Sequence, residues 1–217
     1  MSVTVRQVTD PSEAEIDAYT KLLAEAFSYR FFAFALGGDK DLQEPMHRAH
    51  ITAALANNGG EVHIAELPDE GVVGVAVWFP PGSKFLSTEA QREAGWNQLM
   101  AKLELELRDW WTQFLDEYDD MVERALGPDV KLGAYHLQLI GVHPQRRRKG
   151  IARALMQFAE SKAHAVGVAS VLETGSSSRV SVYEGLGYTV AGSGPIHLLP
   201  KDKTFEMSAY IKHTESN

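Results

Sequence analysis

The pattern of apolar and polar positions predicts an alternation of strands and helices, beginning near the N-terminus. Apolar residues alternate with polar ones over residues 3–8, which indicates a strand. Helical spacing of apolar residues follows over 12–27 and again over about 41–56. Ser12, with Glu15 three positions later, predicts a capping box at the start of the first of these helices.

The middle of the chain predicts a hairpin and then a helical insertion. Strands of residues 62–66 and 72–79 flank the turn from Pro68 to Gly71, an arrangement typical of a β-hairpin. From about residue 88 to 126 the apolar residues recur at helical spacing. A single helix of that length is unusual in a compact domain, so we expect a bend or two helices here.

The last third of the chain predicts a central strand, a helix and several shorter strands. The central strand begins near residues 132–135, continues through the apolar run 137–142 and ends at Pro144, and helical spacing resumes at Ala152. Further strands are expected at 168–172, 188–191, 196–199 and 205–211, with a short helix at 179–186. This order predicts a mixed α/β fold.

Composition limits the class of protein. The chain has 217 residues, 44% of them hydrophobic, and no linker-like stretch, which predicts one domain over residues 1–217. It has no run of 18 apolar residues and no apolar N-terminal run of signal-peptide type, so we expect a cytoplasmic protein that does not engage a membrane. The absence of cysteine excludes a cysteine nucleophile and a disulfide framework.

The net charge of −8 limits the partners. A nucleic-acid groove needs an excess of lysine and arginine over one face, so an acidic chain argues against such a partner. The acidic balance instead favours a cationic small substrate, such as an amine. His47 and His50 lie three positions apart on a predicted helix but lack a third ligand at matching spacing, so we expect no metal site.

A dense run of positive charge lies between the central strand and the helix that follows it. Arg146 to Lys149 are four consecutive cations, and Gly150 comes next. The first N–H groups of a helix lack partners within it, and the helix dipole favours an anion there. Because Gly150 allows close approach of the backbone, this turn predicts a seat for a phosphate or pyrophosphate. The simpler alternative is a basic turn in an ordinary strand and helix unit.

The spacing within this turn distinguishes between phosphate-binding motifs. The Walker loop and the dinucleotide fingerprint both require glycines that are absent here. The pattern that is present, from Val142 to Ala152, is Val-x-Pro-x-x-Arg-x-x-Gly-x-Ala. It resembles the acetyl-CoA signature of the GNAT superfamily of N-acetyltransferases.

A second stretch supports this resemblance. Residues 172–190 contain Leu-Glu-Thr and then Tyr-Glu-Gly-Leu-Gly-Tyr, which resembles the closing motif of the same superfamily. Val75 to Trp78, followed by Pro80, is most similar to the branch with puromycin N-acetyltransferase and its fungal and bacterial relatives. The resemblance implies a mixed, mostly antiparallel sheet of six to seven strands, flanked by helices and splayed at its central strands, with residues 88–126 as an insertion.

The resemblance also implies an acetyl-CoA site and direct transfer of the acetyl group to an amine. The backbone of the central strand would hold the pantetheine arm, and the turn after it would hold the pyrophosphate. By position, the residues of this site are Ile140, Gly141, Val142, Arg147, Arg148, Lys149, Gly150, Ile151, Ala152 and Arg179. Arg179 departs from the superfamily, in which many relatives have asparagine at that position.

Two residues are candidates for proton transfer. The resemblance gives Tyr183 the role of general acid, which protonates the departing CoA thiolate; the alternative is an aromatic packing residue on a short helix. Glu173 follows a strand that enters the cleft, and it is the best candidate for the base that removes a proton from the acceptor ammonium. The alternative for Glu173 is a structural hydrogen-bond acceptor.

An acceptor pocket is expected beside the insertion. His136 and Gln138 alternate with Leu137 and Leu139, so we expect the two polar side chains to share one face of the central strand. The candidates for contact with the acceptor are Tyr29, Phe34, Trp78, Trp110, His136 and Gln138. The alternative for the aromatic residues, and for His136, is a place in the core.

The predicted function is transfer of an acetyl group from acetyl-CoA to a primary amine of a small molecule. One alternative is acetylation of a protein N-terminus or lysine, which an open groove would favour. Another is a non-catalytic acyl-CoA sensor, which Arg179 leaves open. We expect a monomer or a homodimer, and the sequence does not name the acceptor.

Overall fold

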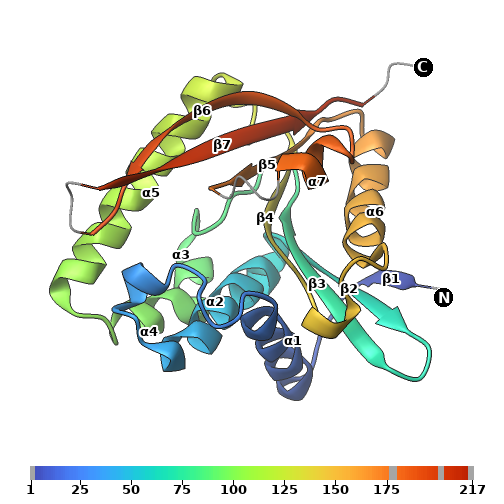
Figure 1. Ribbon diagram of the computed structural model, residues 1–217, viewed down its shortest axis with the longest axis horizontal. Coiled ribbons are helices and arrows are strands. Elements are labelled where there is room, and N and C mark those ends of the chain that lie inside the picture. The colour runs from blue at the N-terminus through green and yellow to red at the C-terminus, as the bar shows by residue number, and fades with distance from the viewer. Residues whose placement is uncertain (1–2, 176–179, 200–202, 215–217) are drawn as a thin grey trace.

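The computed structural model describes residues 3–175, 180–199 and 203–214. Through these residues runs a seven-stranded sheet in the order β1-β2-β3-β4-β5-β7-β6 (Figure 1). The strands are β1 Thr4–Gln7, β2 Glu61–Leu67, β3 Gly71–Phe79, β4 Tyr135–Val142, β5 Ser170–Thr174, β6 Thr189–His197 and β7 Thr204–Lys212. Among these strands β4 and β5 are parallel, and every other neighbouring pair is antiparallel. The mostly antiparallel α/β fold predicted from the sequence is confirmed.

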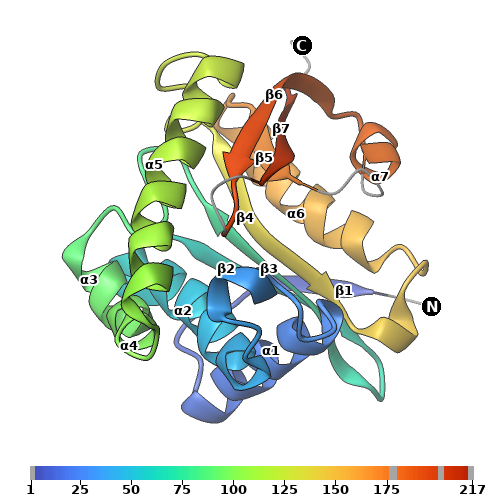
Figure 2. The same cartoon turned by 60° about the vertical axis from the view of Figure 1, so that its left-hand side comes forward.

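Helices cover both faces of this sheet (Figure 2). They are α1 Glu13–Ala26, α2 Gln43–Leu55, α3 Glu89–Gln91, α4 Asn97–Met100, α5 Leu105–Leu126, α6 Ile151–Ala165 and α7 Val180–Glu184. The helices α1 and α2 pack on one face, and α6 packs on the other. The capping box predicted at Ser12 and Glu15 is present. No helix of the described residues has the length and apolar character needed to cross a bilayer.

The side chains of β3 show how the two faces are filled. Val75, Val77 and Phe79 lie in the cluster formed with α1 and α2. Ala76 and Trp78 lie in the cluster on the α6 side. Successive side chains of a strand point to opposite faces, so a strand covered by helices on both sides needs a continuous apolar run.

The insertion is divided into two helical parts, as the sequence predicted. The first part consists of α3, a π-turn at Arg92–Trp96 and α4, and α5 begins after a turn at residues 101–104. The buried side of α5 carries aromatic residues that pack against Ile196 of β6 and Met207 of β7. Figures 1 and 2 show α5 running beside these two strands.

The two central strands separate after a short stretch of pairing. β4 pairs with β5 at Tyr135, His136 and Leu137. The remainder of β4, as far as Val142, stays paired with β3 but has no neighbouring strand on its β5 side in the described part of the chain. The predicted splay at the central strands is therefore present.

A bulge in β4 changes which side chains share a face. Leu137 pairs with Trp78 and Leu139 pairs with Val77, so Gln138 is an extra residue between them. Leu137 consequently packs in the cluster on the α6 side, whereas Leu139 packs with α1 and α2. The regular alternation predicted for residues 136–139 is wrong, because one inserted residue reverses the order of the faces.

β6 is a single strand where the sequence predicted two, at 188–191 and 196–199. It pairs with β7 along its length, with one irregularity between Val190 and Gly192. Pro195 interrupts the apolar pattern but not the strand. A proline lacks the N–H group that a second neighbour would need, and β6 lies at the edge of the sheet, where one neighbour suffices.

Two histidines of α2 are buried without charge. His47 is fully buried between the rings of Phe27 and Phe31, and neither ring nitrogen has a hydrogen-bond partner in the described structure. His50 is 4% exposed, and its Nδ1 lies 2.8 Å from the carbonyl oxygen of Met46. Burial lowers the pKa of His47 to about 3 and the pKa of His50 to about 4.

These pKa values predict a loss of stability in mild acid. Below the usual pKa of 6.5 the two histidines of the unfolded chain bind protons, whereas buried His47 and His50 do not. The free energy of unfolding is therefore highest above pH 6.5 and falls as the pH drops towards 4. The free energy of unfolding should decrease by about 2 kcal/mol per histidine between pH 7.5 and pH 5. Urea titrations of His47→Phe should show a flatter pH dependence, and the exposed control His164→Gln should not. If the free energy of unfolding of His47→Phe falls with pH as steeply as that of the parent protein, the burial of a neutral imidazole at His47 is contradicted.

Candidate active site

A cavity of about 950 Å³ opens where β4 and β5 separate. Its walls include residues of β4, β5, β7, α2, α5, α7, the π-turn at Arg92–Trp96, the segment after α1 and the loop after β3. Aromatic rings line much of it: Phe31, Phe32, Phe34, Phe85, Trp96, Trp111 and Phe114. These rings pack on one another; the ring of Trp111, for example, lies 5.4 Å from those of both Phe32 and Phe114. One side of the cavity is therefore a continuous aromatic wall.

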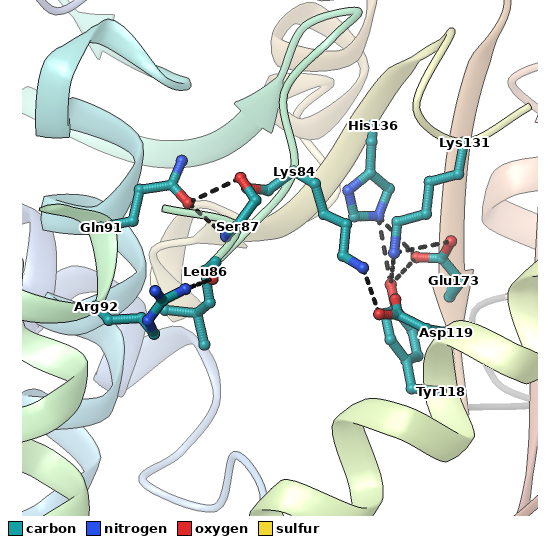
Figure 3. Close-up of polar contacts among 10 residues, drawn as sticks. All are labelled: Lys84, Leu86, Ser87, Gln91, Arg92, Tyr118, Asp119, Lys131, His136 and Glu173. Atoms are coloured by element: carbon teal, nitrogen blue, oxygen red, sulfur yellow. Dashed lines mark hydrogen bonds and ion pairs between the residues drawn. The ribbon is translucent and has the colours of Figure 1, made fainter. Parts of the chain in front are cut away.

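The other side of the cavity is polar and centres on Glu173 (Figure 3). Tyr118 of α5 donates a hydrogen bond of 2.5 Å to Glu173 Oε2, and His136 Nε2 lies 2.8 Å from the same oxygen. Lys131 donates to the Tyr118 hydroxyl at 2.8 Å and lies 4.0 Å from Glu173 Oε1. The side chains of three separate segments thus converge on one buried carboxylate.

The charge state of this cluster follows from its contacts. Burial raises the pKa of Glu173, but Lys131, His136 and Tyr118 more than offset this and hold it at about 2. Burial, helped by the charge of Lys131, lowers the pKa of His136. Burial raises the pKa of Tyr118 well above its usual value. At neutral pH the cluster therefore holds a carboxylate, a neutral imidazole and a neutral phenol.

The loop after β3 is fastened over the cavity from two sides (Figure 3). Lys84 of this loop forms an ion pair with Asp119 of α5. On the other side, Gln91 accepts a hydrogen bond of 2.8 Å from the Ser87 amide, and Arg92 donates one of 2.7 Å to the Leu86 carbonyl. The loop thereby places Phe85 and Leu86 in the cavity wall.

The turn between β4 and α6 has the backbone geometry expected of an anion-binding site. Arg148 and Gly150 both have positive φ, at 60° and 79°, and Gly150 is the N-cap of α6 without a side chain to cap it. The first amides of α6 consequently have no acceptor within the helix. Arg148 and Lys149 are exposed beside them. Backbone donors and two cations are thus available to a phosphate group.

The other cations of this turn, and Gly141, hold the turn in place. Arg146 forms an ion pair with Glu70, and Arg147 donates a hydrogen bond of 2.6 Å to the carbonyl of Ala26 at the end of α1. A Cβ atom on Gly141 would lie 2.9 Å from the Cβ of Ala26, so only glycine lets α1 pack this closely on β4. The end of α1 and the turn are therefore fixed relative to each other.

The structure brings some of the predicted site residues together and separates others. Those that line the cavity are Phe34, Gln138, Ile140, Glu173 and Tyr183. His136 lies immediately behind Glu173, and Trp110 is a buried ring packed against Phe34 and Phe114. Two residues lie elsewhere: Trp78 is fully buried on the α6 side, and Tyr29 donates a hydrogen bond to Glu44. Arg179 lies outside the described residues.

Tyr118, Lys131 and His50 are among the cavity residues that were not predicted from the sequence. Tyr118 and Lys131 bind around Glu173, and His50 lines the cavity next to Phe85. Tyr118 belongs to the insertion, whose place beside the cavity was the available signal. Nothing in the local sequence of Lys131 or His50 distinguishes them from an ordinary turn lysine and a core histidine.

Part of the chain that builds this cavity resembles a known protein family. Residues 127–195 match the family model described as the acetyltransferase (GNAT) domain. This segment contains β4, the cation-rich turn, α6, β5 and α7, of which β4, β5 and α7 line the cavity. The match indicates an N-acetyltransferase with acetyl-CoA as the acetyl donor, as the motifs predicted. A comparison with curated protein sequences gives no match.

Solved structures share this fold over nearly the whole chain. A mosquito arylalkylamine N-acetyltransferase like 5b is 16% identical with a TM-score of 0.65, covering 98% of this chain and 100% of that one. A histone acetyltransferase HPA2 and related acetyltransferase from Corynebacterium glutamicum is 18% identical with a TM-score of 0.62, covering 100% and 99%. The Drosophila melanogaster polyamine N-acetyltransferase is 18% identical with a TM-score of 0.58, covering 98% and 100%. The fold is therefore that of GNAT acetyltransferases.

Proposed function

We propose that the protein transfers the acetyl group of acetyl-CoA to a primary amine of a small molecule. The observation that carries this proposal is the cavity at the splay of β4 and β5, which has an aromatic wall on one side and Glu173 on the other. Helices, strands and loops surround it, which suits a small acceptor better than a protein chain. The solved structures with this fold include enzymes named for arylalkylamines and polyamines, which supports an amine acceptor.

The residues present fit acetyl-CoA at two places. The amides at the start of α6, with Arg148 and Lys149, suit the pyrophosphate. The free edge of β4 beyond Leu137 suits the pantetheine, and the Ile140 amide would polarise the thioester carbonyl. One donor of this kind contributes about 10² to 10³ in rate.

The chemistry is a direct aminolysis. The acceptor nitrogen attacks the thioester carbonyl carbon and forms the amide bond, and the carbon–sulfur bond breaks with its electron pair going to sulfur. Tyr183 lines the cavity and donates its phenolic proton to that sulfur. The proton lost by the amine passes to water, and the Tyr183 phenolate regains a proton from water. The products are an acetylamide and CoA.

Glu173 binds the acceptor nitrogen in this proposal and does not act as the base. A carboxylate with a pKa of about 2 accepts a proton poorly from an ammonium group. Its Oε2 already accepts from Tyr118 and has His136 beside it, whereas Oε1 has no hydrogen-bond partner. The oxygen Oε1 is buried and lies 4.0 Å from the Lys131 ammonium, so in this proposal an acceptor N–H group binds it in competition with Lys131.

The proposal covers the chain as a whole. It treats residues 1–217 as one N-acetyltransferase domain, cytoplasmic, monomeric or homodimeric, without a nucleic-acid or membrane partner. Residues 75–78 resemble the branch with puromycin N-acetyltransferase, and membership of that branch is part of this proposal. Acetylation of a ribosomal protein, the activity named for a neighbour from Escherichia coli, is the second candidate, since that chain shares the fold at a TM-score of 0.53.

Two measurements test the proposed function. Acetyl-CoA at 100 times its dissociation constant should raise the melting temperature by about 5–10 °C, whereas an unrelated nucleotide should not. A screen of small amines that follows the release of CoA thiol should then find turnover. If acetyl-CoA leaves the melting temperature unchanged, the assignment of acetyl-CoA as the donor is refuted. If acetyl-CoA binds but no amine or peptide is acetylated, an acyl-CoA sensor is favoured.

A further inference from the structure

The carboxylates of the cavity are already matched by cations. The two that line it are Glu173 and Asp119. Lys131 lies 4.0 Å from Glu173, and Lys84 forms an ion pair with Asp119 (Figure 3). Arg30 also lines the cavity, so the described lining holds three cations and two carboxylates. The chain has a net charge of −8, yet the lining of this cavity has a small excess of positive charge.

An ammonium group gains little from such a lining. Glu173 Oε1 is buried, and a cation that reached it would lie within a few ångströms of the Lys131 ammonium. Like charges this close repel each other, the more so where little water separates them. The cation also loses its hydration shell, and only an unmatched negative charge offsets that loss. The described lining offers none, because each of its carboxylates has a lysine beside it.

The aromatic wall does not replace the missing negative charge. A ring face attracts a cation, but the ring of Tyr118 already has the Lys131 ammonium 4.0 Å from its centroid. The other rings of the wall pack largely on one another. Phe34 is 38% exposed, so part of the apolar surface still contacts water. Covering this surface with an uncharged ring favours binding in proportion to the area covered.

Uncharged hydrogen-bond acceptors face the cavity instead. Gln138 and His50 both line it. The Gln138 amide has no hydrogen-bond partner among the described residues. His50 donates from Nδ1 to the Met46 carbonyl, which leaves the lone pair of Nε2 available, and burial lowers the pKa of this ring to about 4. Both side chains therefore accept N–H groups at neutral pH without carrying a charge.

Gln138 stands across the splay from Glu173. Leu137 and Leu172 form the last pair between β4 and β5, and Gln138 and Glu173 are the residues that follow them. Gln138 is also the extra residue of the β4 bulge, a feature that redirects a side chain. Ile140 comes two residues later, about 7 Å along the strand. An amine bound between Gln138 and Glu173 thus lies beside the amide that would polarise the thioester.

We propose that the acceptor is an aromatic amine whose nitrogen is uncharged at neutral pH, and that Gln138 accepts one of its two N–H groups. This inference rests on the proposed function, because it names the acceptor class of the same site. The second N–H group shares Glu173 with Lys131, which an uncharged donor does without charge repulsion and an ammonium does not.

An uncharged nitrogen also removes the need for a base before attack. Its lone pair attacks the thioester carbonyl carbon directly, and the carbon–sulfur bond breaks with its electron pair going to sulfur. Sulfur takes the proton of Tyr183. The nitrogen then loses one proton to water, and the Tyr183 phenolate regains one from water. The low pKa of Glu173, at about 2, is no obstacle to this route.

Two isomeric amines isolate the charge of the nitrogen. 4-Ethylaniline and 2-phenylethylamine contain the same atoms and the same ring. At pH 7 the first is uncharged, because its lone pair is delocalised into the ring, whereas the second is an ammonium ion like a lysine side chain. With acetyl-CoA saturating, kcat/KM for 4-ethylaniline should be higher by a factor of about 10 or more. Release of CoA thiol and the mass of the acetylated amine are the measurements.

A change of charge at Gln138 tests this residue. Gln138→Glu places a carboxylate of nearly the same shape at the splay, where an ammonium then finds an unmatched negative charge. The ratio of kcat/KM for 2-phenylethylamine to that for 4-ethylaniline should rise about tenfold. Gln157→Glu makes the same change at an exposed position of α6 outside the cavity and should leave the ratio unchanged. A ratio within one variant cancels differences in nucleophilicity and in the amount of folded enzyme.

A change of charge at Lys131 tests the matching of Glu173 independently. Lys131→Gln removes the cation beside this carboxylate, so the same ratio should again rise about tenfold. Lys102→Gln removes a charge at an exposed site outside the cavity and should not change it. The shift of melting temperature with acetyl-CoA shows that each variant is folded and binds the donor. If one of the two cavity variants does not fold, the other still decides.

The possible outcomes distinguish this inference from the proposed function. If acetyl-CoA neither binds nor reacts, the proposed function fails, and the inference fails with it. If the parent protein acetylates 2-phenylethylamine as well as or better than 4-ethylaniline, or if the ratio stays unchanged in the folded cavity variants, the inference is overturned and the function stands. If the donor binds and no amine turns over, a higher melting temperature of the CoA complex with 4-ethylaniline alone supports the inference, and any other result overturns it.

Discussion

Replacing Tyr183 by phenylalanine is expected to lower the turnover number by about 10² to 10⁴ while fold and acetyl-CoA affinity are retained. The phenol lines the cavity, and its ring packs against Tyr188 and Tyr210 at 6.3 and 5.8 Å between centroids. Phenylalanine keeps this packing and removes only the hydroxyl. The thiolate would then leave without a positioned proton donor.

Tyr188→Phe is the matched control for this experiment. It removes a hydroxyl from a buried tyrosine that packs on Tyr183 but does not line the cavity, so its turnover should stay near that of the parent protein. Both variants should be assayed with a substrate for which chemistry is rate-limiting. Normal turnover in Tyr183→Phe would assign this tyrosine to the core and leave protonation of the thiolate to water.

Local features of the sequence were predicted well because local physics determines them. The capping box at Ser12 and Glu15 needs only two side chains three positions apart. The turn after β4 is similar, since β4 ends at Val142 shortly before Pro144, and the N-cap of α6 is Gly150, where positive φ suits glycine. The turn was also part of the family resemblance, which gave the fold and the proposed donor site.

Features that depend on distant partners could not be predicted in this way. The bulge at Gln138 exists only in the pairing of β4 with β3, and nothing in the apolar run of β4 marks it. Trp78 and Trp111 both belong to apolar patterns in the sequence, yet one is enclosed beneath α6 and the other lines the cavity. An apolar pattern indicates burial but does not say against which element.

The cluster around Glu173 shows the same limit at the site. Its partners Tyr118 and His136 are 55 and 37 residues away in sequence, and Lys131 comes from a turn with no motif. Sequence reasoning therefore found the carboxylate but gave it the role of base. The three partners lower its pKa to about 2, and this favours binding of the acceptor over removal of its proton.

Replacing Gly150 by aspartate is expected to abolish the stabilisation by acetyl-CoA while α6 remains folded. Gly150 is the N-cap of α6 with φ of 79°, and no atom lies within 4 Å of the Cβ position, so the side chain has room. Aspartate tolerates positive φ better than most residues and accepts hydrogen bonds from the first amides of a helix. It would therefore occupy the donors that the pyrophosphate needs and repel its charge.

Gly150→Asn separates the charge from the geometry of this change. Asparagine has nearly the same shape, also tolerates positive φ and also caps helices, but it is neutral. We expect it to keep part of the shift of about 5–10 °C that saturating acetyl-CoA gives the parent protein, whereas aspartate loses it. Melting curves with and without acetyl-CoA measure both. An equal shift in the aspartate variant would place the pyrophosphate elsewhere, because a carboxylate at the N-cap cannot share the α6 amides with a bound phosphate.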